Sequence, residues 1–259
     1  MVVLGIPYDS NQTYITGSRF APTYIRIASE SIEEYSMLQG IDIRNLDISD
    51  WGDVEVSFGN FEETSKRVEH ALKELSFAEK YLFIGGDHTI TLFTINFFRG
   101  EVRKYVHLDA HGDFEDTYLG SRYTHDSVLR RIGEILGWEN ICLLGVRSLS
   151  QKAHRELENL GIEYYTSLEI KENPEILRDN LRNADYISID IDVIDPAYAP
   201  EVANPEPLGL APVEIINGLL ETKPKFVDVV EAVPRDHTSI TAILAATLIR
   251  EILIILSKT

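Results

Sequence analysis

Residues 105–113 read YVHLDAHGD and contain the pattern from which the fold and the chemistry of this chain can be argued. The stretch opens as an apolar strand and then places Asp109, His111 and Asp113 at alternate positions. In extended chain, alternate residues point to the same side. Two carboxylates and an imidazole would therefore converge where a buried strand leaves its sheet, which is typical of a metal site. The alternative is a strand end whose polar residues turn into solvent.

Composition favours one large α/β domain over residues 1–259, because 44% of the residues are apolar and can form a sizeable core. The formal net charge is −18, and no stretch is rich in Lys or Arg. This charge argues against nucleic acid and against an anionic membrane as partners. Small cationic substrates and metal ions suit the negative electrostatic field of this chain better. An acidic surface also keeps a protein soluble, which is the alternative explanation.

The chain ends and the one cysteine favour a cytoplasmic location. The initial MVVLGI has no basic region before a longer apolar core, so no secretory signal is expected. The most apolar segment, Ile240–Leu256, is interrupted by Arg250 and Glu251 and is interpreted as a buried C-terminal helix. Cys142 has no possible intrachain partner, which suits a reducing compartment.

Short apolar runs alternate with longer amphipathic runs along the whole chain. This alternation predicts an α/β fold with a mainly parallel sheet and crossover helices. The expected strands are Val2–Ile6, Tyr81–Ile84, Tyr105–Leu108, Ile141–Leu144, Glu163–Tyr165, Tyr186–Ile189 and Phe226–Val230. The expected helices are Phe61–Leu75, His88–Phe98, His125–Leu136, Ser150–Leu160, Pro174–Leu181, Pro212–Leu220 and Ser239–Leu256. Two long irregular stretches, Ala110–Thr124 and the proline-rich Asp192–Ala211, follow strands and are candidate functional loops.

Potential metal ligands follow several of the expected strands. Because the carboxyl ends of parallel strands lie at one edge of the sheet, these side chains should meet there. Buried carboxylates without cations would repel one another, and two divalent ions would balance four of them. An oxygen-rich set with one imidazole per ion and no thiolate suits Mn²⁺ better than structural Zn²⁺. The residues concerned are His88, Asp109, His111, Asp113, Asp190 and Asp192, with Glu231 after the last strand.

The same stretches resemble the signature motifs of the ureohydrolase (arginase/agmatinase) superfamily. They are GGDHT (85–89), LDAHGD (108–113), SIDIDVIDP (188–196), AYAPEVANPEPLGL (197–210) and DVVEAVP (228–234). The amino-terminal GIPYDS (5–10) and YITGSRFAPTYIRIAS (14–29) are similar to the agmatinase branch in particular. The resemblance implies a three-layer α/β/α sandwich with a mainly parallel sheet, and a homo-oligomer, commonly a trimer or hexamer.

The resemblance also implies roles for individual residues. His88, Asp109, Asp113 and Asp190 would hold one Mn²⁺, and His111, Asp109, Asp190 and Asp192 the other. Glu231 would pair with the substrate guanidinium, and a salt bridge to a residue such as Arg235 is its alternative role. His125 would shuttle protons or position substrate. The implied reaction is attack of a hydroxide shared by the two ions on the guanidinium carbon, releasing urea and an amine that is protonated by Asp192 or His125.

The choice of substrate depends on weaker signals. Glu115 and Asp116 follow the central motif, where they would repel an α-carboxylate and favour the terminal ammonium of agmatine, unless they face solvent. The expected activity is agmatinase, which makes putrescine and urea. The alternatives are guanidinobutyrase, arginase or formimidoylglutamase, or a metal-binding homologue without turnover.

Three departures from the family pattern affect specificity. Asp126 follows His125 where the family has a small residue, and an extra acid there would assist ammonium binding or indicate a different substrate. Glu201–Asn204 replaces a glycine-rich run, and Leu208 replaces a glycine. Two further residues have open roles: His107 as a partner of Asp109 or a core histidine, and Arg147 in a loop or subunit contact.

Overall fold

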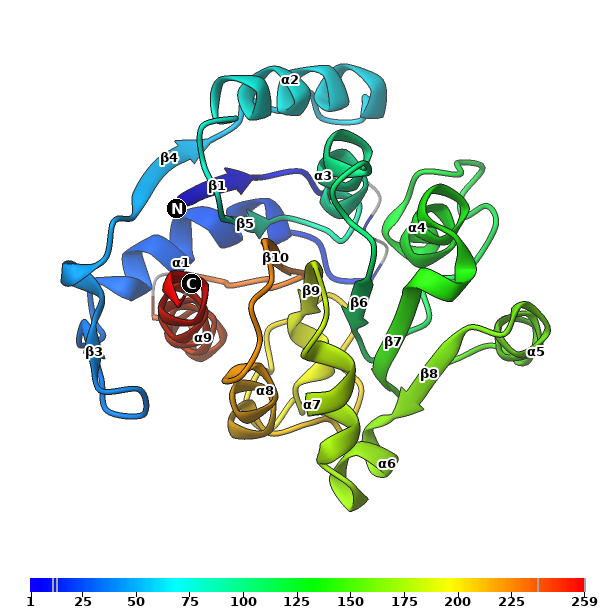
Figure 1. The fold of residues 1–259 in the computed structure, drawn as a ribbon. Coiled ribbons are helices and arrows are strands. Elements are labelled where there is room, and N and C mark those ends of the chain that lie inside the picture. Colours follow the sequence, from blue (N-terminus) through cyan, green and yellow to red (C-terminus); the bar gives the residue numbers. More distant parts are fainter. Residues whose placement is uncertain (11, 13, 237, 259) are drawn as a thin grey trace.

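The computed structural model describes residues 1–10, 12, 14–236 and 238–258, and its centre is an eight-stranded sheet in which every pairing is parallel. The strand order is β4-β1-β5-β10-β9-β6-β7-β8 (Figure 1). The strands are β1 (Val2–Ile6), β4 (Ser49–Asp53), β5 (Tyr81–Gly85), β6 (Tyr105–Leu108), β7 (Ile141–Val146), β8 (Glu163–Thr166), β9 (Tyr186–Asp190) and β10 (Phe226–Val230).

Helices cover both faces of this sheet and complete three layers (Figure 1). One face packs against α1 (Ala21–Ser29), α6 (Ser167–Glu172), α7 (Glu175–Leu181), α8 (Pro212–Leu219) and α9 (Ile240–Ser257). The other face packs against α2 (Phe61–Glu74), α3 (Ile90–Phe98), α4 (Val128–Leu136) and α5 (Gln151–Leu160). The predicted fold class, a mainly parallel α/β/α sandwich, is confirmed.

The two faces of the central strands differ in chemistry. The face under α9 is aliphatic, with Val106 and Ile189 among its residues. The face under α3 begins with buried aromatic rings such as Tyr105 and then, two residues further along each strand, carries buried polar groups. These polar groups are His107, Ser188 and Asp228, all fully buried. A polar layer therefore lies directly below the carboxyl edge of the sheet.

All seven expected strands are present, and five further helices and strands were not predicted. They are α1, α6, the edge strand β4 and a small antiparallel pair of β2 (Tyr35–Ser36) and β3 (Ile41–Asp42). β4 has the polar sequence SDWGD and is mostly exposed, so it lacks the apolar run of a buried strand. The expected helix starts at His88 and Ser239 shift by one or two residues, since α3 begins at Ile90 and α9 at Ile240. His125 lies in a short 3-10 turn, His125–Ser127, before α4.

The C-terminal helix is buried, as the sequence predicts. α9 is long and apolar enough to cross a membrane, but 67% of it is buried inside the protein, where it packs against α1 and α8. Its one buried acid, Glu251, pairs with Arg250 and accepts hydrogen bonds from Ser36 and Gln39. The apolar sequence of α9 is therefore explained by its packing in the hydrophobic core.

Candidate active site

The sheet order brings the predicted site residues together. β5, β10, β9 and β6 are neighbours, so their carboxyl ends present His88, Glu231, Asp190 and Asp109 side by side. The turn after β5 can approach β1 closely because it contains Gly86, where an added Cβ would lie 2.0 Å from the carbonyl oxygen of Tyr8. This close approach fixes the start of the segment that carries His88.

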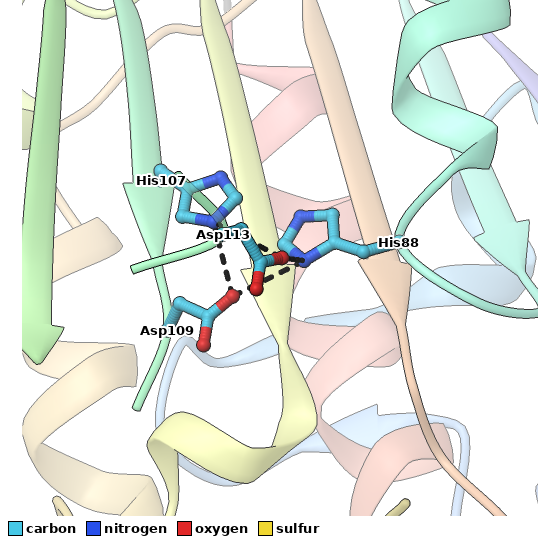
Figure 2. A group of neighbouring side chains, drawn as sticks. All are labelled: His88, His107, Asp109 and Asp113. Atoms are coloured by element: carbon cyan, nitrogen blue, oxygen red, sulfur yellow. Dashed lines mark ion pairs between the residues drawn. The ribbon is translucent and has the colours of Figure 1, made fainter. Parts of the chain in front are cut away.

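The first ligand group surrounds the imidazole of His88. Its Nδ1 lies 3.2 Å from Asp109 Oδ2, 3.3 Å from Asp113 Oδ2 and 3.2 Å from Asp190 Oδ2. Figure 2 shows His88, Asp109 and Asp113 pointing toward one another, with His107 beside them. His88, Asp109, Asp113 and His107 are all buried.

The second ligand group lies toward the surface and shares Asp109 with the first. His111 Nδ1 is 2.8 Å from Asp192 Oδ2 and 3.5 Å from Asp109 Oδ1. Two backbone hydrogen bonds hold the carboxylates: the amide of Ala110 donates to Asp192, and the amide of Asp192 donates to Asp190. The structure thus brings all six predicted ligands into two adjoining groups.

A buried polar network supports His88 from below. Its Nε2 is 2.8 Å from Ser188 Oγ, and the Ser188 hydroxyl donates to Asp228. Asp228 also accepts hydrogen bonds from Tyr186 and Thr91. With Nε2 engaged, the Nδ1 of His88 is left to face the carboxylates.

His107 contacts both the network and the ligands. Its ring stacks on that of His88 with centroids 4.3 Å apart, and its Nε2 lies 3.0 Å from Asp109 Oδ2. Its Nδ1 is 2.7 Å from the Tyr105 hydroxyl. Burial lowers the pKa of His107 to about 4, which keeps the ring neutral. Of its two possible roles, the structure favours a partner that orients Asp109.

The chemistry of these groups fits bound divalent cations. Among the described residues, His88 Nδ1 and Asp109 Oδ2 have no hydrogen-bond partner, although both are buried and face each other. Burial and neighbouring carboxylates raise the pKa values of Asp113 and Asp190 well above the ordinary range. Unpartnered buried atoms and crowded buried carboxylates both cost free energy. Bound cations would remove these costs by coordinating the lone pairs and neutralising the carboxylates.

A cavity of about 330 Å³ opens onto the two ligand groups. Its described lining includes four of the predicted ligands, His111, Asp113, Asp190 and Asp192, together with His125, Asp126 and Glu231. The remaining lining residues are Tyr14, Tyr118, Ala203 and Asn204. The cavity is large enough for a small linear substrate next to the ligands.

Glu231 is held at the cavity by two donors. Its Oε1 accepts the backbone N–H of His88 at 2.7 Å, and its Oε2 accepts the side-chain amide of Gln12 at 2.5 Å. Glu231 has φ +63° and Asp113 has φ +46°, a backbone region that costs energy for residues other than glycine. Arg235, its alternative partner in the sequence analysis, instead lies near Glu201.

His125 lines the same cavity as four of the predicted ligands. Its Nδ1 is buried without a hydrogen-bond partner among the described residues, and the ring meets that of Tyr118 edge to face. Burial lowers the pKa of His125 to about 4, so the ring is neutral at ordinary pH. A neutral ring beside the cavity can accept or relay a proton.

Two predicted substrate-binding residues lie elsewhere. Glu115 pairs with Lys152 at 2.8 Å, and Asp116 pairs with Arg131 at 2.6 Å. Neither carboxylate is part of the described lining of the main cavity. The left-handed turn at Asp113 changes the chain direction, so the alternation that serves residues 109–113 no longer applies beyond it.

Other cavity residues were not singled out from the sequence. Gln12, Tyr14, Tyr118 and Asn204 come from loops without a periodic pattern, and Asn204 contacts His111 at 2.9 Å. The sequence feature that could have pointed to them is their location. Tyr14 lies in the amino-terminal motif, Tyr118 in the first long loop and Asn204 in the proline-rich loop.

Comparison with known proteins agrees with this geometry. A sequence model of the Arginase family matches residues 1–255. The chain is 34% identical to an agmatinase of Pyrococcus horikoshii, over 84% of this chain and 77% of that protein. It is 33% identical to an N(1)-aminopropylagmatine ureohydrolase of Thermococcus kodakarensis, over 96% and 88%. The solved structure of an agmatine ureohydrolase of Thermoplasma volcanium superposes with a TM-score of 0.91 at 33% identity, over 98% and 89%.

The family match covers nearly the whole chain, and the solved structure shares the sheet and its covering helices. The chain belongs to the arginase family, in its agmatinase-like ureohydrolase branch, and is a metal-dependent hydrolase of amidine C–N bonds.

Proposed function

We propose that this enzyme is a manganese agmatinase, which hydrolyses agmatine to putrescine and urea. The observation that carries the proposal is the cavity, whose described lining contains two acids that are not proposed metal ligands, Asp126 and Glu231, and no described Lys or Arg. A substrate with cationic groups at both ends suits such a lining, whereas the carboxylate of arginine or guanidinobutyrate would be repelled. The agmatinase relatives support the same choice.

His88, Asp109, Asp113 and Asp190 would hold one Mn²⁺, and His111, Asp109, Asp190 and Asp192 the other. Divalent ions held there would supply the Lewis acidity that activates water as a nucleophile at neutral pH. Glu231 binds the guanidinium and turns its carbon toward the ligand groups. Its two donors, His88 and Gln12, fix the carboxylate for this task.

The reaction also requires a proton transfer by residues around the cavity. Water adds to the guanidinium carbon, the bond from that carbon to the substituted nitrogen breaks, and the leaving amine takes up a proton. His125 and Asp192 both line the cavity and are the groups that we propose for this transfer. We propose that the His125 imidazole, which lines the cavity, relays a proton toward the leaving amine.

A longer substrate is the second candidate. A side cavity of about 210 Å³ shares His111, Asp113 and Asp126 with the main cavity and is lined further on by Glu115 and Ser150. An agmatine that carries an aminopropyl group would extend into this space, as the Thermococcus kodakarensis relative's name suggests for that protein.

Urea release is the deciding experiment. The purified protein with Mn²⁺ is incubated with agmatine, N1-aminopropylagmatine, guanidinobutyrate and arginine, and the kcat/KM values are compared. We expect the two amines to be preferred over the two acids. Absence of urea from all four compounds would refute an amidinohydrolase with these substrates, and preference for an acid would refute the charge argument.

Replacement of Glu231 separates binding of metal from turnover. Glu231→Gln keeps size and backbone but removes the charge that faces the guanidinium, so kcat/KM should fall by at least about 100-fold. Metal content measured by atomic emission should stay as in the wild type, because Glu231 is not a proposed ligand. Unchanged turnover in this variant would contradict its role.

A further inference from the structure

One carboxylate in the cavity has no task in the proposed reaction. Of the described lining acids, Asp113, Asp190 and Asp192 are proposed ligands, and Glu231 is assigned to the guanidinium. Asp126 remains. It lines both the main cavity and the side cavity, so it lies where the two meet.

The surroundings of Asp126 differ from those of the acids near it. Glu115 pairs with Lys152 and Asp116 with Arg131, whereas the Asp126 carboxylate has no ion-pair partner among the described residues. Burial and the charge of Glu115 raise the pKa of Asp126 to about 6. A partly buried acid with anionic neighbours and no cation is a binding position for a cation that comes from outside.

The backbone around Asp126 is fixed, so its carboxylate is presented from a rigid position. Its carbonyl oxygen accepts the amide of Glu115 at 3.0 Å. The turn His125–Ser127 that contains it is closed by reciprocal bonds between Thr124 and Ser127 and leads directly into α4. Asp126 is thus held next to His125, at the same wall of the cavity.

We propose that Asp126 binds the ammonium group of the substrate and thereby selects guanidino compounds with a cationic tail over those with a neutral or anionic tail. This inference rests on the proposed function, since it takes Glu231 as the site of the guanidinium. A linear diamine derivative then spans the cavity between two carboxylates. Glu115 and Asp116, which were expected from the sequence to bind the ammonium, already have ion-pair partners in Lys152 and Arg131.

The rival explanation is structural. Asp126 lies in the first turn before α4, where an acid stabilises a helix N-terminus. Loss of that contribution would reduce activity toward every substrate alike. A loss confined to substrates with an ammonium group would not follow from it.

The test compares three substrates of similar length: agmatine, n-butylguanidine and 4-guanidinobutyrate. The Mn²⁺-loaded wild type, Asp126→Asn, Asp126→Ser and the control Asp179→Asn, on the exposed side of α7, are assayed for urea release. We expect Asp126→Asn and Asp126→Ser to lower kcat/KM for agmatine by about 10- to 100-fold, through KM, because a charge-assisted contact is lost. For n-butylguanidine the change should stay within about twofold, and for 4-guanidinobutyrate kcat/KM should rise. Asp179→Asn should leave the ratio of agmatine to n-butylguanidine unchanged.

Equal losses of kcat/KM on agmatine and n-butylguanidine in the two Asp126 variants would overturn the proposal and support the structural explanation. An agmatine KM that is unchanged in these variants would also overturn the proposal. A wild type that hydrolyses none of the three compounds would instead contradict the proposed function. The use of two substitutions guards against one variant that fails to fold, and the substrate ratio within each variant is independent of its folded fraction.

Discussion

Gln12 and Glu231 lie 219 positions apart in the chain, yet the amide of one holds the carboxylate of the other. The Gln12 carbonyl oxygen in turn accepts the amides of Gly17 and Ser18, so the side chain links the amino-terminal loop to the cavity. Gln12 is therefore placed to position Glu231, the residue proposed to bind the substrate guanidinium.

Removal of this contact should affect substrate binding more than turnover. Gln12→Met keeps the length of the side chain and removes its donor, so the KM for agmatine should rise by about 5- to 20-fold, since a hydrogen bond to a charged group is lost. The kcat should change less than KM. The matched control is Gln39→Met, because Gln39 donates to Glu251 far from the cavity. Equal KM values for the two variants would contradict the assignment.

Prediction from the sequence worked for single residues wherever the backbone is extended. Asp109, His111 and Asp113 alternate at the end of a strand, and the structure places all three at the two ligand groups. Beyond Asp113 the rule fails, because the left-handed turn sends Phe114 into the core under Arg130. Glu115 and Asp116 then pair with Lys152 and Arg131 outside the main cavity, whereas Asp126 is part of its described lining.

Among the elements, the proline-rich loop 192–211 is tied to the end of β7 by the side chain of Arg147. The Arg147 guanidinium, just after β7, donates to the carbonyl oxygens of Asp192 at 2.7 Å, Glu206 at 2.8 Å and Pro207 at 2.9 Å. Of the two roles open in the sequence analysis, the loop contact is present. The same loop carries a proposed ligand, Asp192, and Asn204 at the cavity.

Arg147→Ala should therefore weaken both stability and metal binding. The loss of several charge-assisted bonds to buried carbonyl groups should lower the free energy of unfolding by about 2–4 kcal/mol. Arg147→Lys should recover only part of the lost free energy of unfolding, because one ammonium cannot reach all the carbonyl groups. Urea denaturation measures the free energy of unfolding, and Mn²⁺ titration measures the affinity for the metal. Arg103→Ala, at an exposed ion pair, is the control and should cost less than about 0.5 kcal/mol.

At the level of elements, burial decided what the sequence could predict. Central strands such as β9 are buried on both faces and read as apolar runs, so they were found with nearly correct bounds. β4 pairs only with β1 and is polar, which leaves no pattern to detect. Leu208 adopts φ +67°, a left-handed conformation that favours glycine, so the turn at this position carries backbone strain.

On the scale of the whole molecule, the formal charge of −18 is concentrated in part at the ligand groups, where cations should stabilise the fold. Mn²⁺ at 100 times its dissociation constant should add about 2.7 kcal/mol to the free energy of unfolding. For a chain of this size, Tm should then rise by roughly 5–10 °C relative to protein treated with EDTA. Differential scanning calorimetry measures the shift.

Two variants test where that stabilisation arises. Asp190→Asn should abolish most of the shift in Tm, because Asp190 is proposed to bind both ions. Asp179→Asn, on the exposed side of α7, removes the same charge and should keep the full shift. An equal shift in both variants would mean that Mn²⁺ binds elsewhere. We expect a trimer or hexamer, which light scattering of the same samples will report.

The strand order has a consequence for synthesis of the chain. β10 is the last strand to be made, and it inserts between β5 and β9 in the middle of the sheet. A nascent chain that ends before residue 226 already contains all six proposed ligands but lacks the strand that sets His88 beside Asp190. Until then β5 and β9 expose unpaired edges, which invite association with other chains. We therefore expect the two ligand groups to assemble only after nearly the whole polypeptide has left the ribosome, and metal loading to follow synthesis.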